Sequence, residues 1–195
     1  STDNTFAIAH SFCEKEPVFS AYHLEKGGKG RAVRFGMLEA KGKYRFMCDA
    51  DLSMPINELD KFLPPLIDDP KIVIGSREVE GSVRYKEPSF RHIGGRVVNL
   101  MIRLLAVPGI MDTQCGFKLF SAEVAEDIFN HQSVLSWGFD IELLYIARLR
   151  GYKIIELPIN WYYGESSHVS PFKDTLEMLK DILVIRWNHF RGRYE

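Results

Sequence analysis

Residues 44–53, YRFMCDADLS, decide the fold class of this 195-residue sequence. Five residues with the character of a buried strand lead directly into two acids, Asp49 and Asp51, separated by one small residue. A helix pattern near 55–67 follows, and then KIVIGSR at 71–77, an apolar run that suits a strand covered on both faces. This β-α-β order predicts a mainly parallel sheet in an α/β domain, with functional residues at the carboxyl ends of its strands.

The rest of the sequence continues the alternation of helix and strand patterns. The expected helices cover 3–14, 31–41, 55–67, 88–107, 121–129, 137–152 and 171–194. The expected strands cover 18–24, 44–50, 71–77 and 153–163, and DTQCGFKLF at 112–120 indicates a turn that enters another strand. The sequence begins inside a helix pattern and without Met, so we expect a strand and a helix upstream of Ser1.

The composition is that of a globular protein and excludes several functional classes. Hydrophobic residues make up 46% of the sequence, which is enough to bury a core. The formal net charge of -1 gives no overall attraction to nucleic acid. The three cysteines lie far apart without metal-ligand spacing, which favours a reducing compartment over a disulfide framework. The sequence contains no run of about 18 apolar residues, the pattern of a membrane-spanning helix.

The acid pair after the strand of 44–50 is the strongest candidate for a metal site. Two neighbouring carboxylates repel each other unless a cation lies between them. Hard oxygen ligands suit Mg²⁺ or Mn²⁺, which keep coordination positions free for water and substrate phosphates. A structural alternative is that Asp51 or Ser53 caps the following helix while Asp49 only ends the strand.

A second functional interpretation is open for the same residues. The pattern of Asp49 and Asp51 after an apolar strand also resembles the first motif of haloacid-dehalogenase-type phosphatases, in which the first Asp is a nucleophile. That chemistry needs a downstream Lys, for which Lys118 is available, and a late acidic pair. The acidic pair Asp68–Asp69 lies in a loop before a strand, which weighs against a phosphatase.

Two positively charged positions accompany the acid pair. Lys29, between Gly28 and Gly30, stands at a predicted helix N-terminus, where free N–H groups and the helix dipole favour an anion. Arg77 ends the strand of 71–77, at the same edge of the predicted sheet as Asp49, and an arginine there can clamp a phosphate. A flexible turn with a surface lysine and a solvated arginine remain the structural alternatives.

Four segments in order carry a resemblance to a known family. These segments are GKGRAVRFGMLEAKGKYRFMCDADLS, IGSR, GIMDTQCGFKLF and WGFDIELLYIARLRGYKIIELPINW. Together they resemble the inverting glycosyltransferases of family two, above all the branch that moves a sugar, glucose foremost, from a nucleotide donor to dolichyl or another polyprenyl phosphate. The resemblance implies a GT-A fold, the nucleotide-diphospho-sugar transferase fold, over 1–170, followed by a C-terminal amphipathic helix over 171–195.

The resemblance also implies roles for the residues around the donor sugar nucleotide. Asp49 and Asp51 match the metal-binding DxD motif, so the cofactor is expected to be Mg²⁺ or Mn²⁺, and Asp51 is expected to be catalytic. Lys29 is expected to assist the diphosphate of the donor, UDP-glucose being favoured and GDP-mannose the alternative. His168 stands in the loop where many members carry a lysine for the same diphosphate. Asp140, from the FDxEL motif, is expected to be catalytic on the sugar side.

The resemblance further implies how the acceptor is held. Arg77 and Arg91 match residues that hold the lipid phosphate in related proteins. Glu142 matches the second acid of FDxEL, although an acidic first helical turn is an equally good explanation for it. Asp112 and Gly116 are expected to shape the turn on the sugar side.

The location of the acceptor implies a membrane partner. A polyprenyl phosphate lies in a bilayer, so the resemblance implies a peripheral protein at the cytoplasmic face of a membrane. The helices near 91–107 and 171–190 combine apolar stripes with basic flanks, which suits the membrane interface. Packing against the core is the alternative for both helices. The sequence predicts no nucleic-acid partner and gives no indication of an oligomeric state.

Overall fold

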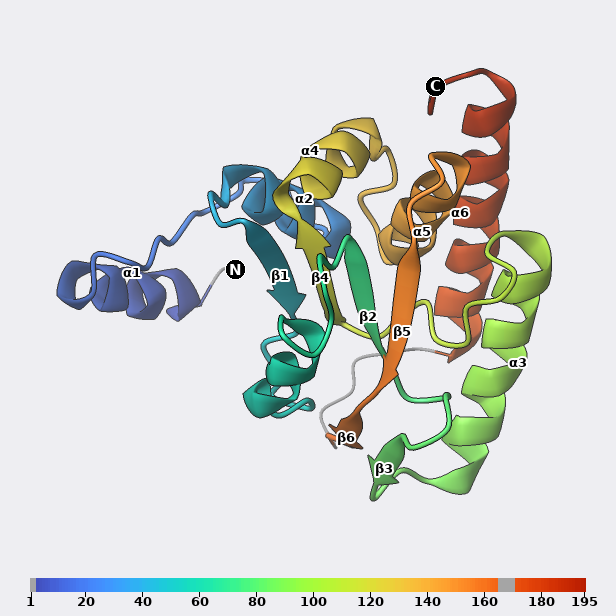
Figure 1. Ribbon diagram of the computed structural model, residues 1–195, viewed down its shortest axis with the longest axis horizontal. Coiled ribbons are helices and arrows are strands. Elements are labelled where there is room, and N and C mark those ends of the chain that lie inside the picture. Colours follow the sequence, from blue (N-terminus) through green and yellow to red (C-terminus); the bar gives the residue numbers. More distant parts are fainter. Residues whose placement is uncertain (1–2, 165–170) are drawn as a thin grey trace.

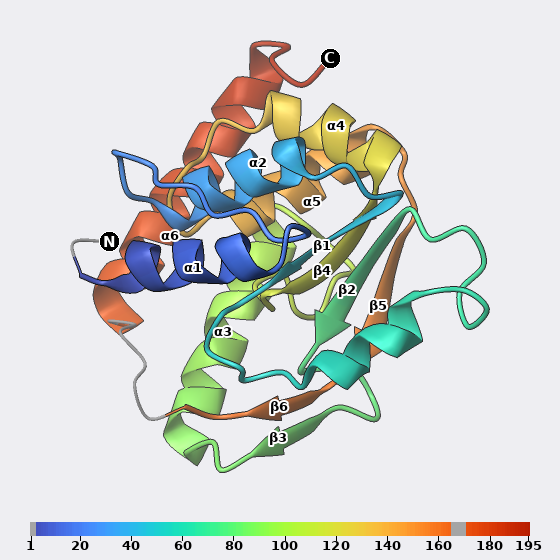
Figure 2. The same cartoon turned by 90° about the vertical axis from the view of Figure 1, so that its left-hand side faces the viewer.

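A four-stranded β-sheet forms the centre of the protein, as the computed structural model in Figure 1 shows. The structure describes residues 3–164 and 171–195, and of their side chains all except those of 89–93 and 171–174. The strands of the sheet are, in chain order, β1 (Tyr44–Cys48), β2 (Ile72–Ser76), β4 (Phe117–Ser121) and β5 (Ile154–Pro158). β3 (Val83–Tyr85) and β6 (Asn160–Tyr162) pair in parallel as a separate ribbon, seen below the main sheet in Figure 2.

The sheet is mixed, with one strand reversed. Its spatial order is β1-β4-β2-β5, and β4 runs antiparallel to both β1 and β2, whereas β2 and β5 run parallel. β1, β2 and β5 therefore point in the same direction. The predicted α/β class is confirmed, and the parallel orientation holds for these three strands. The insertion of β4 between β1 and β2 was not predicted, because nothing in a strand's own sequence records which neighbours it will pair with.

Alternating side chains of the strands feed two hydrophobic cores on opposite faces of the sheet. One core joins Ile72, Ile74 and Phe120 to buried residues of the helices. The second core joins Val73 and Leu119 to residues on the other face. The strand β2 is buried along its whole length because both of its faces are covered.

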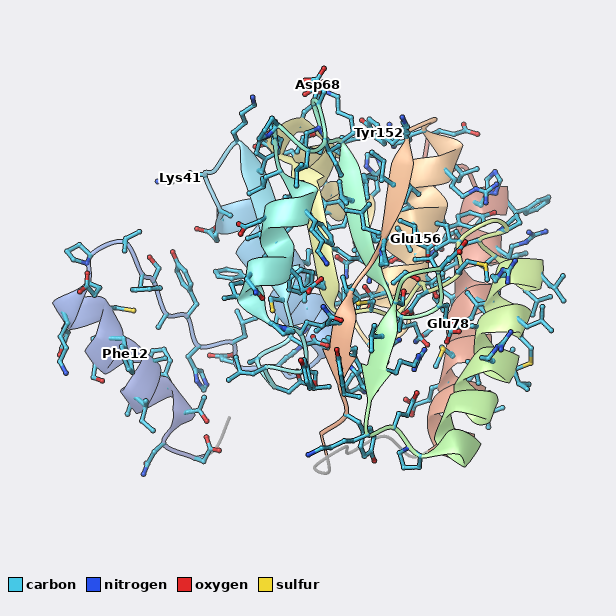
Figure 3. All side chains as sticks on the ribbon, turned by 60° about the horizontal axis from the view of Figure 1, so that its bottom comes forward. Phe12, Lys41, Asp68, Glu78, Tyr152 and Glu156 are labelled. Carbon is cyan, nitrogen blue, oxygen red and sulfur yellow. The ribbon has the colours of Figure 1, made fainter. Side chains whose placement is uncertain are left out.

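The helices cover the sheet and one of its ends. They are α1 (Thr5–Lys15), α2 (Lys29–Glu39), α3 (Ser89–Leu105), α4 (Ala122–His131), α5 (Phe139–Leu149) and α6 (Pro171–Phe190). α6 contributes Ile182 and Ile185 to the larger core and lies beside α5 and α3 (Figure 1). None of the residues of α1 is buried, and Figure 3 shows Phe12 of this helix apart from the sheet.

The structure corrects three of the predicted elements. The segment 18–24 is not a strand, and the described residues provide no neighbouring strand on that side of β1. The predicted helix of 55–67 is only a 3₁₀ helix, η1 (Ile56–Phe62), because Leu63 precedes Pro64 and is therefore held extended. The predicted strand of 153–163 divides at Ile159 into β5 and β6. The N–H of Ile159 donates to the carbonyl of Ser76, and its own carbonyl accepts the N–H of Val83. The pairing partner therefore changes at this residue from β2 to β3.

Candidate active site

The candidate site lies at one edge of the sheet, where three chain segments meet. β1 and β2 run in the same direction and end at this edge, which places Asp49 and Arg77 there. Because β4 runs the opposite way, the loop that enters it, residues 111–116, arrives at the same edge. The reversed strand therefore brings the turn of Asp112 and Gly116 between the two sites that the sequence predicted.

Asp49 is held at this edge by two neighbours. Its backbone N–H donates to the carbonyl of Gly116 over 2.9 Å, which extends the pairing of β1 with β4 by one residue. Its Oδ1 lies 2.7 Å from Nζ of Lys29. A Cβ atom at position 116 would lie 2.1 Å from Oδ2 of Asp49, so only glycine leaves room for this carboxylate. Gly116 is thus required by the position of the Asp49 side chain.

Asp51 is exposed and forms the turn that follows Asp49. Its Oδ1 accepts the N–H of Ser53 at 2.9 Å, which forms an Asx-type turn. The alternative that Asp51 or Ser53 caps the following helix is wrong, because Pro55 is the N-cap residue of η1 and no side chain caps that helix. Between them, Leu52 adopts a φ of 57°, a left-handed conformation that is uncommon for a branched side chain and is often found at functional turns. The turn therefore presents both carboxylates at one edge without making either of them inaccessible.

The donor atoms at this turn fit a hard divalent cation. Both side chains offer carboxylate oxygens, which Mg²⁺ and Mn²⁺ prefer, and the negative charge of Asp49 is paired with the ammonium of Lys29. Among the described residues, no group of three or more His, Cys, Asp or Glu side chains gathers in a metal-binding arrangement. A cation bound by Asp49 and Asp51 would therefore depend on water and ligand oxygens for its other positions, as Mg²⁺ commonly does.

Lys29 begins a helix as predicted, two residues earlier than the expected start of 31. Gly28 is the N-cap residue of α2 and has a φ of 131°, a conformation that favours glycine. The ammonium of Lys29 lies 5.3 Å from the ring centroid of Trp137, which is half exposed. Trp137 was not predicted as a site residue, although it is the first residue of the quoted segment WGFDIELLYIARLRGYKIIELPINW, and an aromatic residue at that position is a signal that could have been used.

Asp140 is brought to the same region but is buried. It stands in the first turn of α5, and its Oδ1 accepts a hydrogen bond of 2.6 Å from Nζ of Lys118. Burial raises the pKa of this carboxyl above its ordinary value, and the charge of Lys118 only partly offsets that effect. The charges of Lys29 and Asp49 also act on this pKa, which places Asp140 within electrostatic reach of both. The partner, Lys118, was considered only for the phosphatase interpretation.

Arg77 is fixed by a bidentate ion pair that the sequence did not predict. Its Nε and Nη2 lie 2.6 and 2.9 Å from the two carboxylate oxygens of Asp112. Burial alone would raise the pKa of Asp112, but the charge and hydrogen bonds of Arg77 outweigh it and lower the pKa to about 2. Glu156 of β5 completes the network, because its carboxylate accepts the N–H groups of Met111 and Asp112.

Glu142 is a structural residue within the described chain. Its buried carboxylate accepts hydrogen bonds from the N–H groups of Ser133 and Val134 and from the hydroxyls of Ser133 and Tyr194. These bonds tie the loop before α5 to the C-terminal residues. Of the two open explanations for Glu142, the structure supports a role in the fold. Two further predicted residues lie outside what is described: the side chain of Arg91, and His168 entirely.

The phosphatase interpretation fails on the sheet topology. Asp68 and Asp69 precede β2, and Asp49 follows β1. Because β1 and β2 run in the same direction, these two acidic groups lie at opposite edges of the sheet. Figure 3 shows Asp68 at the top of the molecule and Glu78, which follows β2, well below it. Lys118, the other residue that this chemistry would need, is engaged by Asp140 and the carbonyl of Cys115.

Comparison with known proteins points to one family. Residues 1–129, which include both aspartates, match the family model described as glycosyl transferase family 2. The dolichyl-phosphate beta-glucosyltransferase of Dictyostelium discoideum is 35% identical over 201 residues, covering 98% of this chain and 62% of the relative. The human protein of the same name is 34% identical over 204 residues, covering 100% of this chain and 63% of the relative. The chain thus spans somewhat less than two thirds of these relatives.

Solved structures support the fold. The glucosyl-3-phosphoglycerate synthase of Mycobacterium tuberculosis, determined in complex with Mn²⁺, UDP-glucose and glycerol 3-phosphate, superposes with a TM-score of 0.60 at 17% identity. The match covers 95% of this chain and 64% of that one. The mannosyl-3-phosphoglycerate synthase of Rubrobacter xylanophilus gives a TM-score of 0.61 at 15% identity, covering 99% and 62%. The predicted GT-A fold is confirmed by these similarities.

Proposed function

Because the chain belongs to glycosyl transferase family 2, we propose that it transfers a hexose, glucose foremost, from a nucleotide-diphosphate sugar to dolichyl or another polyprenyl phosphate. The observation that carries this proposal is the gathering of Asp49, Asp51 and Lys29 at the carboxyl edge of the sheet. It places acidic ligands for a cation beside a lysine at a helix N-terminus, the combination that a sugar diphosphate needs. The choice of glucose and of a lipid phosphate is supported by the printed names of the relatives, dolichyl-phosphate beta-glucosyltransferases.

The residues of the edge suit the departure of a nucleoside diphosphate. We propose that Asp49 and Asp51 hold the divalent cation, which when bound supplies positive charge for the leaving diphosphate. Lys29 is placed to add a second positive charge, because its ammonium already lies 2.7 Å from Asp49. We propose the same diphosphate contact for His168. UDP-glucose is the favoured donor, and GDP-mannose is the alternative that an experiment must separate from it.

The acceptor side of the reaction needs no general base. A phosphate monoester is largely ionised near pH 7, so the residues only have to place its oxygen behind C1 of the sugar. In-line attack from that side inverts C1 and gives a β-linked product from an α-linked donor. Arg77 is proposed for this task because Asp112 fixes its guanidinium through Nε and Nη2, while its Nη1 makes no hydrogen bond with the described residues. Arg91 is proposed with it.

Asp140 is proposed as the carboxylate on the sugar side of the site. Lys118 fixes its Oδ1, and the influence of the charges of Lys29 and Asp49 on the pKa of Asp140 supports a position near them. Since the acceptor is already an anion, Asp140 is proposed to orient the sugar and does not need to remove a proton. Trp137 lies in the turn before α5, and its half-exposed ring lies 5.3 Å from the ammonium of Lys29.

We propose that the protein acts at the cytoplasmic face of a membrane through the C-terminal helix α6. The exposed apolar side chains Leu183, Trp187 and Phe190 recur on one side of this helix. The guanidinium of Arg191 lies 4.6 Å from the ring centroid of Trp187, a pairing of cation and aromatic ring that suits the headgroup region. Within residues 3–164 and 171–195, no helix combines the length and apolarity needed to cross a bilayer.

The decisive experiment measures donor binding and transfer together. The full-length protein is titrated with UDP-glucose and with GDP-mannose, each with and without Mn²⁺, by calorimetry. The same four conditions are then tested for transfer of radiolabelled sugar to dolichyl phosphate in detergent. Of the four conditions, we expect binding and transfer only when UDP-glucose and Mn²⁺ are both present. Mn²⁺-dependent transfer from GDP-mannose would correct the sugar, and Mn²⁺-independent transfer would remove the metal from the proposal. Donor binding without transfer to any polyprenyl phosphate would contradict the proposed acceptor.

A further inference from the structure

A second polar feature lies beside the candidate site, between the segment that follows β2 and the helix α3. This groove encloses about 810 Å³. Four arginines and two glutamates line it, an excess of two positive charges. These charged residues are Arg77, Arg84, Arg96, Arg103, Glu78 and Glu87. Arg77 connects the groove directly to the edge of the sheet described above.

Two of the four arginines are already neutralised within the protein. Arg77 is bound by both oxygens of Asp112. Arg84 pairs with Glu78, and its Nη1 lies 2.7 Å from Glu87. Its Nε also donates to the carbonyl of Arg77 over 3.0 Å. These interactions fix the wall of the groove formed by 77–87, and they leave little of that wall's positive charge for a ligand.

The opposite wall carries the uncompensated charge. Arg96, Asn99 and Arg103 stand three and four residues apart on α3, which places them in a row along one side of the helix. In the part of the chain that the structure describes, the guanidinium groups of Arg96 and Arg103 form no hydrogen bond or ion pair. Two long side chains separated by two helical turns, with an amide between them, can converge on one anion of the size of a phosphate.

Apolar side chains continue the same wall. Val97 and Leu100 also line the groove, and they are 56% and 52% exposed. Leu104, one turn beyond Leu100, is 76% exposed. A small hydrophilic phosphate would leave these surfaces in water, whereas a ligand with an apolar chain attached to its phosphate would cover them. The groove thus combines an anion site with an apolar track.

We infer that Arg96 and Arg103 bind the phosphate of an isoprenoid phosphate monoester, whose chain lies along Val97, Leu100 and Leu104. This inference rests on the proposed function, since the ligand is the acceptor of the proposed reaction. It adds Arg96 and Arg103 of α3 to the proposed acceptor contacts of Arg91 and of Arg77, whose Nε and Nη2 are held by Asp112. Arg96 and Arg103 act as binding residues and take no part in the chemical step.

The test compares single substitutions on α3 with a matched substitution elsewhere. Arg96→Gln and Arg103→Gln are measured beside Arg148→Gln, which removes an exposed arginine from the last turn of α5. Loss of one charged contact should raise the KM for the polyprenyl phosphate by about tenfold or more. The KM for the sugar nucleotide should stay within about twofold of the wild type, and Arg148→Gln should change neither value. Arg103→Lys keeps the charge and should recover part of the lost affinity.

A binding measurement separates this inference from the proposed function. Flotation is performed with phosphatidylcholine vesicles that contain either polyprenyl phosphate or the uncharged polyprenol. Stronger binding to the phosphate, weakened in Arg96→Gln and Arg103→Gln, supports the inference even if no sugar is transferred. Variants that fold, transfer and float like the wild type would overturn the inference and leave the proposed function intact. Inorganic phosphate and a short-chain isoprenoid phosphate are then compared as competitors that release the protein from these vesicles. If both release it equally at the same concentration, the role of the apolar track is overturned.

Discussion

Lys29 and Asp49 come from different elements and form an ion pair of 2.7 Å at the edge of the sheet. Lys29 is the first residue of α2, and Asp49 is the first residue after β1. The pair compensates the charge of Asp49 before any cation or diphosphate arrives, which lowers the cost of holding two carboxylates in one turn. Under the proposed function, the same lysine would move its interaction from Asp49 to a phosphate oxygen of the sugar diphosphate.

The metal role of the acid pair leads to the first prediction. Asp51→Asn keeps the size of the side chain but removes the charge, so cation-dependent transfer should fall by at least about 100-fold. Thermal unfolding should change little, because Asp51 is exposed and an amide oxygen can also accept the N–H of Ser53. Asp60→Asn, another exposed aspartate, is the control. Equal turnover of both variants in a Mn²⁺ titration would contradict the metal role.

The second prediction concerns Gly116. In Gly116→Ala the new methyl group would overlap the Asp49 carboxylate, whose Oδ2 lies 2.1 Å from the Cβ position, so the carboxylate must move. We expect transfer to fall by about 100-fold, with the dependence on Mn²⁺ shifted to higher concentration. Gly36→Ala is the control, because nothing lies within 4 Å of its Cβ position inside α2. That change should leave transfer unaltered and stabilise the fold by about 0.5–1 kcal/mol, as measured by urea unfolding.

The third prediction concerns the ion pair of Arg77 and Asp112. Asp112→Asn leaves a largely buried guanidinium without its partner and should lower the free energy of unfolding by about 3 kcal/mol. The pKa of Asp112 lies at about 2, below its ordinary value of 3.8, so the folded state binds fewer protons than the unfolded state between these values. The contribution of the pair is therefore fully present above about pH 4 and is lost as the pH falls through 2.

Urea unfolding at a series of pH values checks this sign. The wild type should lose stability as the pH is lowered from 5 to 2, and Asp112→Asn should lose less over the same range. Asp60→Asn should follow the wild type. If Asp112→Asn retains the full pH dependence, then Arg77 and Asp112 do not form this pair in solution.

The fourth prediction separates the two acids of the FDIEL motif. Tyr194→Phe removes the hydroxyl that donates to buried Glu142 over 2.6 Å, which should cost about 1–3 kcal/mol of stability. Donor and acceptor KM values should stay unchanged, since this network faces the C-terminal residues. Tyr22→Phe, at an exposed tyrosine, should have no measurable effect on either property. A large drop in kcat for Tyr194→Phe without a loss of stability would return Glu142 to the active site.

The sequence predicted those parts of the fold that depend on local patterns. The α-helices α1 to α6 were found because apolar periodicity and terminal glycines act within one segment, whereas the helix expected at 55–67 is only a 3₁₀ helix. Lys29 and Asp49 were placed correctly because each directly adjoins a helix start or a strand end. The position of β4 was missed because strand pairing is decided between distant segments. The strand expected at 18–24 failed for the same reason, since an alternating pattern forms a strand only beside a partner.

The partners of the site residues were harder to predict than the residues themselves. Arg77 was chosen because it ends a strand, but its commitment to Asp112, 35 residues away, depends on the reversed direction of β4. Lys118 was known only as a lysine within a strand, and its burial against Asp140 follows from the packing of α5 on the sheet. Long-range ion pairs of this kind leave no spacing signal in one sequence. They determine which arginines remain free to bind a ligand.

The last prediction concerns the surface of α6. Trp187 and Phe190 are 53% and 82% exposed, and their stacked rings lie with a centroid distance of 5.9 Å. If this face enters the membrane interface, the double change Trp187→Ser and Phe190→Ser should reduce binding to phosphatidylserine-containing vesicles by about tenfold or more, because two aromatic side chains lose their apolar contact. The matched control is Val18→Ser with Phe19→Ser, an equally exposed apolar pair in the loop after α1. Flotation should show reduced binding only for the α6 variant. The unfolding curves of the wild type and the two variants should coincide. Equal flotation of both variants would place the membrane contact elsewhere.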